Sequence, residues 1–343
     1  MMSKNAFTSS KKRDRLKKAF FLLVVLSSVS FLTAVVTQMI SSVSRSGVIL
    51  SDVKNSILAD SLCDSALDIV KRILQDDLSR GRYDFYSENF ANEEELWSKT
   101  YILPVDVLYG KIRVIITDEN AKLNVNALVD SQGKTEAVAR QNYLKVFQKF
   151  LKIMRLDERF AGYIQDWIDF DSEGIFEIHQ QSRNWFIPYP EELLFVSNLV
   201  KIDISPLISD YFEGRPDATG YPYITFWPYA GAMKINVNTA PKEIIASFID
   251  KDDALDIADK IVRERKDNPF KTFSEFLVFL SKLVPLSPEN FFNLRPEMIF
   301  DIGSEIFSVK IFCESYGVQS GLQVVLMRGA TEQSFETLFF RRF

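Results

Sequence analysis

The chain has 343 residues, 47% of them hydrophobic and 13% aromatic, which is enough for a membrane anchor and one or two domains with substantial cores. Its net charge of −5 provides no general attraction to nucleic acid, and its single histidine, His179, excludes most histidine-based metal sites and catalytic triads. Cys63 and Cys313 are two isolated thiols rather than a disulfide framework. Cys63 lies in a helical pattern, which favours a packed free thiol, and a disulfide between Cys63 and Cys313 is the alternative.

The amino terminus combines a basic segment with an apolar run. Residues 1–18 carry seven lysines and arginines against one aspartate, and residues 19–44 carry no charge. The apolar run is long enough to span a bilayer, ending at about residue 42. Because the positive flank precedes it, we expect the amino terminus in the cytoplasm and the rest of the chain across the membrane.

The boundary between these segments, KKAFFLLVVL, resembles a type IV prepilin leader that is cut between Ala19 and Phe20. Residues 1–19 would then be the leader. An uncleaved signal anchor is the open alternative, whereas a conventional signal peptide is disfavoured because the apolar run is long and no small-x-small site follows it. Apolar residues continue at helical spacing, so one helix is expected over residues 20–80.

The rest of the chain reads as strands at both ends and helices between them. Residues 81–103 predict a loop and residues 111–117 a strand; from residue 308, three strands separated by turn residues are expected. The predicted helices are 138–154, 161–168, 191–199, 241–248, 254–266, 273–283 and 288–294. The predicted domains are therefore a first β part (81–126), an inserted α-helical domain (127–300) and carboxy-terminal β strands (301–343). Residues 221–234 are aromatic and β-like.

A five-residue phrase occurs twice, as KLNVN at 122–126 and as KINVN at 234–238. Alternation of asparagine with apolar residues predicts a short strand with one solvated and one buried face. After the second copy, Asn238 or Thr239 can cap a helix that has Pro241 in its first turn. Each copy is therefore expected to join a strand to a helix, at the borders of the insertion.

An acidic run follows the predicted helix 161–168. Asp169, Asp171, Glu173 and Gly174 follow D-x-D-x-E-G, the first half of an EF-hand-like calcium loop, and Glu177 is near enough to contribute. The closing glutamate is missing, since Gln180 stands there. A solvated acidic turn at a helix end is the alternative to a calcium site.

The same run offers carboxylates for acid–base chemistry, namely Asp166, Asp169, Asp171 and Glu173. No recognisable partner is spaced to work with them, and His179 is interpreted as a surface residue. We predict that the chain is not an enzyme.

Several blocks occur in the order typical of one family. They are RVIITDENAKLNVNALV, IQDWIDFDSEG, PEELLFV, INVNTAPKEIIASF and TFSEFL. In this order, and with the leader, they resemble the K-type minor pseudopilin of type II secretion systems (general secretion pathway protein K). One departure is that the family's acidic stretch after DWID is longer than residues 174–179 here.

The resemblance implies an α+β fold, with a type IV pilin-like long amino-terminal helix and an antiparallel β-sheet interrupted by a large inserted α-helical domain. It implies an inner-membrane, single-pass protein whose main domain is periplasmic. The implied partners are I- and J-type minor pseudopilins, the prepilin peptidase and the secretion inner-membrane platform. It also favours calcium in the helical domain, and no other cofactor.

Residues 234–283 also resemble the helix-hairpin-helix of membrane-anchored competence DNA receptors. That motif binds phosphate through backbone N–H groups of a glycine-rich hairpin. The hairpin here reads DKDDALD, without glycine, and residues 234–282 have no net charge. DNA binding is kept as the alternative function, and no nucleic acid partner is expected.

The fifth residue after the predicted cut is Val24. Pilins in the body of a fibre carry glutamate there, whose buried carboxylate is thought to meet the amino terminus of a neighbouring subunit. A subunit with valine lacks that partner for a subunit above it. The resemblance therefore predicts a position at the fibre tip, where the protein helps to initiate assembly and export.

Overall fold

The structure is a computed structural model of residues 1–343. The residues it describes are 4–80, 83–84, 101–103, 110–171, 173–178, 182–208, 211–212, 215–216, 220–229, 234–329 and 334–343. The chain divides into two units, residues 1–58 and residues 59–343. Each is described by itself. His179 and Gln180, which follow the predicted calcium ligands in the sequence, lie outside the described residues.

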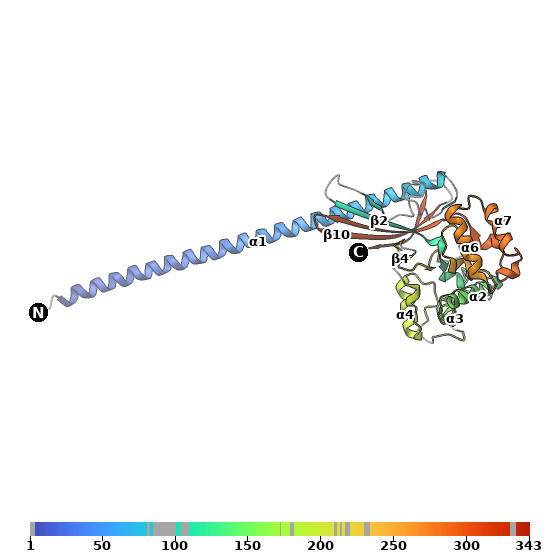
Figure 1. Ribbon diagram of the computed structural model, residues 1–343. Helices are drawn as coiled ribbons and strands as arrows, with labels where there is room; N and C mark the ends of the chain where they lie inside the picture. The colour runs from blue at the N-terminus through green and yellow to red at the C-terminus, as the bar shows by residue number, and fades with distance from the viewer. Residues whose placement is uncertain are drawn as a thin grey trace. The chain divides into compact units, whose positions relative to one another are not determined.

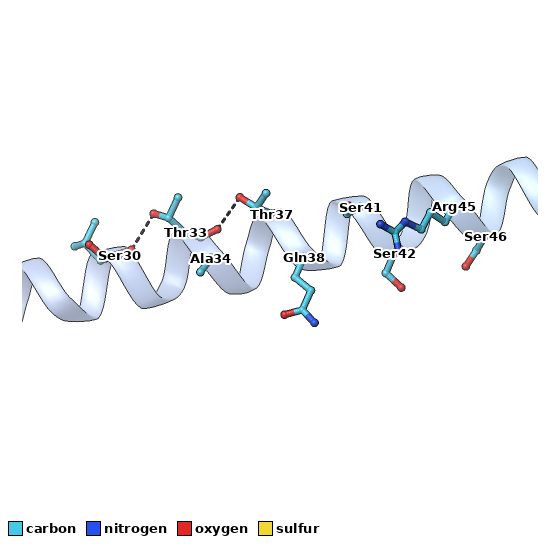
Figure 2. Close-up of a pocket in the computed structure, with 10 residues that line it drawn as sticks. Ser30, Thr33, Ala34, Thr37, Gln38, Ser41, Ser42, Arg45 and Ser46 are labelled. Carbon is cyan, nitrogen blue, oxygen red and sulfur yellow. Dashed lines mark hydrogen bonds between the residues drawn. The ribbon is translucent and has the colours of Figure 1, made fainter.

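The first unit is part of a long helix, α1 (Lys4–Arg80), which starts upstream of the predicted residue 20. The reason is that no glycine or proline occurs before Gly47. α1 is long and apolar enough to cross a membrane. Its hydroxyl groups in the apolar run bond internally: Thr33 and Thr37 donate to carbonyl oxygens four residues earlier, at 2.8 Å (Figure 2). These groups therefore need no water.

The second unit is built on a five-stranded antiparallel sheet in the order β1-β2-β9-β10-β11 (Figure 1). Its strands are β1 (Tyr101–Leu103), β2 (Gly110–Asp118), β9 (Ile306–Ser315), β10 (Val318–Arg328) and β11 (Phe335–Arg342). The last turns of α1 pack on this sheet. Val70 and Leu74 are buried in one core with Val114, Val309 and Val324. Burial alternates along β9 from Val309 to Ser315, as expected where one face of the sheet is covered by a helix, whereas residues 114–118 and 306–309, next to the insertion, are buried throughout.

The helical part interrupts this sheet between two neighbouring strands. β2 and β9 pair over nine positions, from Gly110↔Ser315 to Asp118↔Phe307, although residues 119–305 separate them. The fold class predicted from the sequence is thus confirmed: a long amino-terminal helix and an antiparallel sheet with helical content between its strands. Figure 1 shows α2, α3, α4, α6 and α7 gathered at one end of the sheet.

The insertion contains α2 (Val138–Ile153), α3 (Phe160–Ile168), α4 (Pro190–Val200), α5 (Lys242–Ser247), α6 (Ala254–Asp267), α7 (Phe273–Leu283) and α8 (Pro296–Ile299). Short 3-10 helices are η2 (Glu119–Ala121), η3 (Val125–Leu128), η4 (Ser205–Leu207) and η5 (Pro288–Phe291). Short strands are β3 (Leu123–Asn124), β4 (Tyr211–Phe212), β5 (Arg215–Pro216), β6 (Ile224–Thr225), β7 (Ile235–Asn236) and β8 (Phe300–Asp301). β3 pairs in parallel with β6, and β7 with β8.

Three predicted elements differ from the structure. Residues 101–103, at the end of the predicted loop 81–103, form the edge strand β1, which pairs with β2. The helix expected over residues 288–294 is the single turn η5, because Phe292 and Asn293 take left-handed φ values of 52° and 57° that end it. Within the described part of 221–234, the expected strand shrinks to the two residues of β6.

A separate apolar core fills the insertion. It includes Phe147 and Phe150 of α2, Ile164 of α3, and Ile244 and Ile245 of α5, all fully buried. This core extends onto the sheet through Val325 and Phe339. The insertion is therefore packed against the sheet, within one compact unit.

Candidate junction, metal and assembly sites

The repeated phrase lies at the border between sheet and insertion, and both of its asparagine pairs are buried. Asn124, Asn126, Asn236 and Asn238 expose at most 2% of their surface. The predicted solvated face is therefore wrong. Each first asparagine accepts a hydrogen bond from the N–H of the second, at 3.0 Å from Asn126 and 2.9 Å from Asn238, which is an Asx turn.

Each second asparagine pairs with distant backbone as a strand residue would. The Asn126 amide donates to the Ile187 carbonyl at 3.0 Å and its Oδ1 accepts from the Ile187 N–H at 2.8 Å. Asn238 does the same with Phe270, donating at 2.9 Å and accepting at 2.9 Å. Only an amide side chain can donate and accept in this way. The repeat thus solves one structural problem twice, which is to satisfy the backbone of a buried loop.

The helix after the second copy also begins differently from the prediction. α5 starts at Lys242, with Pro241 at the N-cap position and no side-chain cap. Thr239 donates instead to Asp118, at 2.5 Å. Threonine and asparagine favour helix-capping positions, but here the Thr239 hydroxyl donates its hydrogen bond to the buried Asp118 carboxylate.

Asp118, the last residue of β2, is the centre of this junction. Its Oδ2 accepts from Ser304 at 2.6 Å, from Thr239 at 2.5 Å and from Asn236 at 3.3 Å, and its Oδ1 accepts from the Asn120 N–H at 2.8 Å. Complete burial raises the pKa of Asp118 to about 6, and the hydrogen bonds oppose the rise. β2, the second repeat and the turn before β9 are therefore held together by one carboxylate.

A second buried charge ties the end of α1 to this junction. Arg328, at the end of β10, donates to Asp77 at 2.7 Å and to Asp84 at 3.2 Å. Asp84 in turn accepts from the Ser304 N–H at 2.7 Å. The guanidinium also lies 4.6 Å from the centre of the Phe307 ring. Paired charges of this kind position elements, because removing one partner leaves the other buried and uncompensated.

The acidic run sits at the end of α3. Asp169 is 4% exposed, and its Oδ1 has no hydrogen-bond partner among the described residues; the same holds for Glu177 Oε2. Burial and the charges of Asp171, Asp166 and Glu177 raise the pKa of Asp169 to about 8. Asp171 and Glu177, two other predicted ligands, are therefore near enough to Asp169 to act on it electrostatically.

The predicted ligand Glu173 and the carboxylate Asp166, which is not among the predicted ligands, differ in their relation to Asp169. Glu173 is exposed and is not among the charges that act on Asp169. The charge of Asp166 does act on Asp169, and the Asp166 carboxylate accepts a hydrogen bond from the Phe176 N–H at 2.8 Å. The spacing of Asp166 and Asp169, three residues apart on α3, is the signal that could have included Asp166. Within the described residues, no three carboxylate, histidine or cysteine side chains are arranged to hold a metal ion.

The predicted assembly residues lie in the apolar part of α1. Ala19, Phe20 and Val24 are helical and exposed within residues 1–58, with Phe20 at 70% and Val24 at 44%. Such exposed apolar side chains are expected to meet lipid or other helices. Cleavage after Ala19 stays a prediction.

The buried Asp118 carboxylate predicts a pH dependence of stability. Its folded pKa of about 6 lies above the unfolded value, so its contribution is complete below pH 4 and is lost as the pH rises through 6. Two pKa units correspond to about 2–3 kcal/mol. Asp118→Asn should remove this part of the decline, measured as urea unfolding of the detergent-solubilised chain between pH 4 and 7. An unchanged difference between the two pH values in the variant would contradict the assignment.

Comparisons with known proteins found a similar family model and a similar fold. Residues 235–287 match the family model described as type II secretion system protein K. No curated protein matches the chain. A chain in the crystal structure of the GspK-GspI-GspJ complex from the type II secretion system of enterotoxigenic Escherichia coli has a TM-score of 0.58 at 15% identity. The match covers 84% of this chain and 97% of that chain. The matching segment of sequence and the shared fold confirm the resemblance predicted from the sequence, to the K-type minor pseudopilins of type II secretion systems.

Proposed function

We propose that the chain is a minor pseudopilin at the tip of a type II secretion pseudopilus, where it helps to initiate fibre assembly and protein export. The observation that carries the proposal is the helical insertion of residues 119–305 into a pilin-like sheet that packs on α1. The sequence match and the shared fold support the coarser role of a minor pseudopilin. Both relate the chain to a secretion component rather than to an enzyme.

The tip position rests on two features of different parts of the chain. Residues 119–305 add seven α-helices to the sheet among the described elements, and a repeating shaft would have to accommodate this bulk in every subunit. Val24 also offers no carboxylate to the amino terminus of a subunit above it. A subunit with both features fits at the end of a fibre better than within it.

The partners and the topology follow from the same proposal. The matching structure is that of a complex of GspK with GspI and GspJ. We propose equivalent I- and J-type subunits here, a prepilin peptidase that cuts between Ala19 and Phe20, and the inner-membrane secretion platform. α1 would cross the inner membrane once, with a cytoplasmic amino terminus and a periplasmic main domain.

The rival function, DNA binding by the helix-hairpin-helix-like segment, is opposed by the hairpin between α5 and α6. Lys149 donates to the Ile249 and Lys251 carbonyl oxygens, so the hairpin presents acceptors to a protein cation. The nearby Asp250, Asp252 and Asp253 repel phosphate. The segment fits a structural role in the insertion core.

The function is tested by locating the protein in assembled fibres. Gold-labelled antibody to the wild-type chain should mark fibre ends, and membrane-purified protein should begin at Phe20. Val24→Glu combined with deletion of the helical insertion should allow labels along the shaft, because it restores the missing carboxylate and removes the bulk, whereas Val35→Glu with the same deletion should not. Regular labelling of wild-type fibres along the shaft would contradict the tip position, and an intact Met1 would contradict cleavage.

We also propose a calcium site at the acidic run, formed by Asp166, Asp169, Asp171 and Glu177. The proposal is supported by the buried oxygens of Asp169 and Glu177, which have no hydrogen-bond partner within the described part of the chain, and by the raised pKa of Asp169. A divalent cation would compensate carboxylates that repel one another. Small side-chain adjustments are required, since the described side chains are not arranged as a finished metal site. Bound calcium would neutralise the loop and fasten it to α3.

Calorimetry of the detergent-solubilised chain tests the site. Calcium should bind with a Kd in the range of about 0.1–1 mM, typical of extracellular modules. Asp169→Asn should abolish the heat, and Glu173→Gln, a control outside the cluster, should retain it. Absence of binding at millimolar calcium, or equal binding by both variants, would end the calcium proposal.

A further inference from the structure

The two cysteines of the chain, 250 positions apart, meet beneath the last turns of α1. Cys63 lies on α1 and is fully buried, and Cys313 lies on β9 and is 2% exposed. Both belong to the core between helix and sheet, with Leu67, Val70 and Ile112 as neighbours in it. Both are thiols in the structure.

The strand register places the two sulfur atoms together. Cys63 Sγ lies 3.7 Å from the carbonyl oxygen of Ser320, and Ser320 is the direct antiparallel partner of Cys313. Cys63 therefore sits over the rung of the sheet that contains Cys313. The strongest influence on each thiol is the hydrogen bond between them, which lowers the pKa of Cys63 and raises that of Cys313. One thiol is thus favoured as the thiolate that attacks a disulfide.

Polar contacts hold the helix in register at the same level. Asp60 accepts from Ser320 at 2.6 Å, and Arg342 pairs with Asp60 at 3.0 Å and with Asp64 at 2.6 Å. Asp60 and Asp64 lie within one turn of Cys63 on α1. The contact between the thiols is therefore fixed from both sides and is not a chance approach of two loose segments.

We propose that Cys63 and Cys313 form an intramolecular disulfide that fastens α1 to β9. The placement of the domain in an oxidising compartment rests on the proposed function. The Cys63 thiolate attacks the disulfide of a periplasmic thiol oxidant, and the Cys313 thiolate then attacks the mixed disulfide. One sulfur–sulfur bond forms, the two thiol protons and two electrons pass to the oxidant, and its disulfide is reduced to a dithiol.

The bond would join the membrane helix covalently to the sheet that carries the insertion. Without it, this helix–sheet contact depends on apolar packing, on the hydrogen bond from Ser320 to Asp60, and on the pairs that Arg328 and Arg342 make with α1. A crosslink over so long a loop lowers the entropy of the unfolded chain, and reduction should raise the unfolding equilibrium constant by about a hundredfold or more. The helix end would then stay docked when force or dilution acts on the assembled subunit.

The test counts free thiols in the full chain. Cells that make the wild type, Cys63→Ser or Cys313→Ser are quenched with acid, and the unfolded protein is labelled with maleimide–polyethylene glycol before and after reduction. The wild type should gain no label before reduction and two after it, whereas each single variant should gain one label in both cases. In parallel, purified wild type in detergent is incubated with glutathione disulfide in urea just below its unfolding transition, where local opening admits the oxidant.

The two arms separate the bond from the compartment. Protection in cells supports the disulfide and the periplasmic placement together. Protection only after treatment with glutathione disulfide supports the pairing and contradicts the placement, and hence the proposed function. Two free thiols in both arms overturn the pairing, as does a product that runs as a dimer through one cysteine.

Discussion

A buried backbone must find hydrogen-bond partners, and this constraint governs the point where the chain leaves its sheet and returns to it. The sheet is left after Asp118 and entered again at Ile306. Most of both crossings is buried, since Asp118, Asn236 and Ser304 are buried, and Glu305 just before β9 is exposed. The junction supplies its own partners through one carboxylate and two copies of an asparagine phrase. A large insertion is tolerated because its borders are satisfied internally.

The same device connects the insertion to its own distant parts. Asn126 and Asn238 reach backbone 61 and 32 residues further along the chain. Asn120 reaches the start of β7 through the Lys234 carbonyl, and it accepts from Ile306 at the start of β9. Arg328 adds the end of α1 to this arrangement. The apolar cores provide most of the driving force, and the polar junction selects which segments meet.

Periodicity and family resemblance predicted most of the fold, and packing decided what they missed. The observed bounds of α7 agree with those predicted from its apolar spacing, and the structure adds a capping box formed by Thr272 and Glu275. The asparagine phrases were misassigned to a half-solvated strand, since alternation alone cannot reveal that a polar side chain substitutes for a backbone pair. The sequence predicts the acidic run as a linear motif, yet the charges that raise the pKa of Asp169 include that of Asp166 and not that of Glu173. The contact between Cys63 and Cys313 depends on strand register, which a single sequence does not disclose.

The central claim is that the repeated asparagines act as buried backbone partners, and replacing the amide by its acid is the most direct measurement. Asn238→Asp keeps the shape but loses the donor to the Phe270 carbonyl. The account predicts a loss of about 2–4 kcal/mol in the free energy of urea unfolding at pH 7, since a charge or an unmade hydrogen bond is then buried. Asn268→Asp, at an exposed position, is the matched control. Equal stabilities of the two variants would contradict the account.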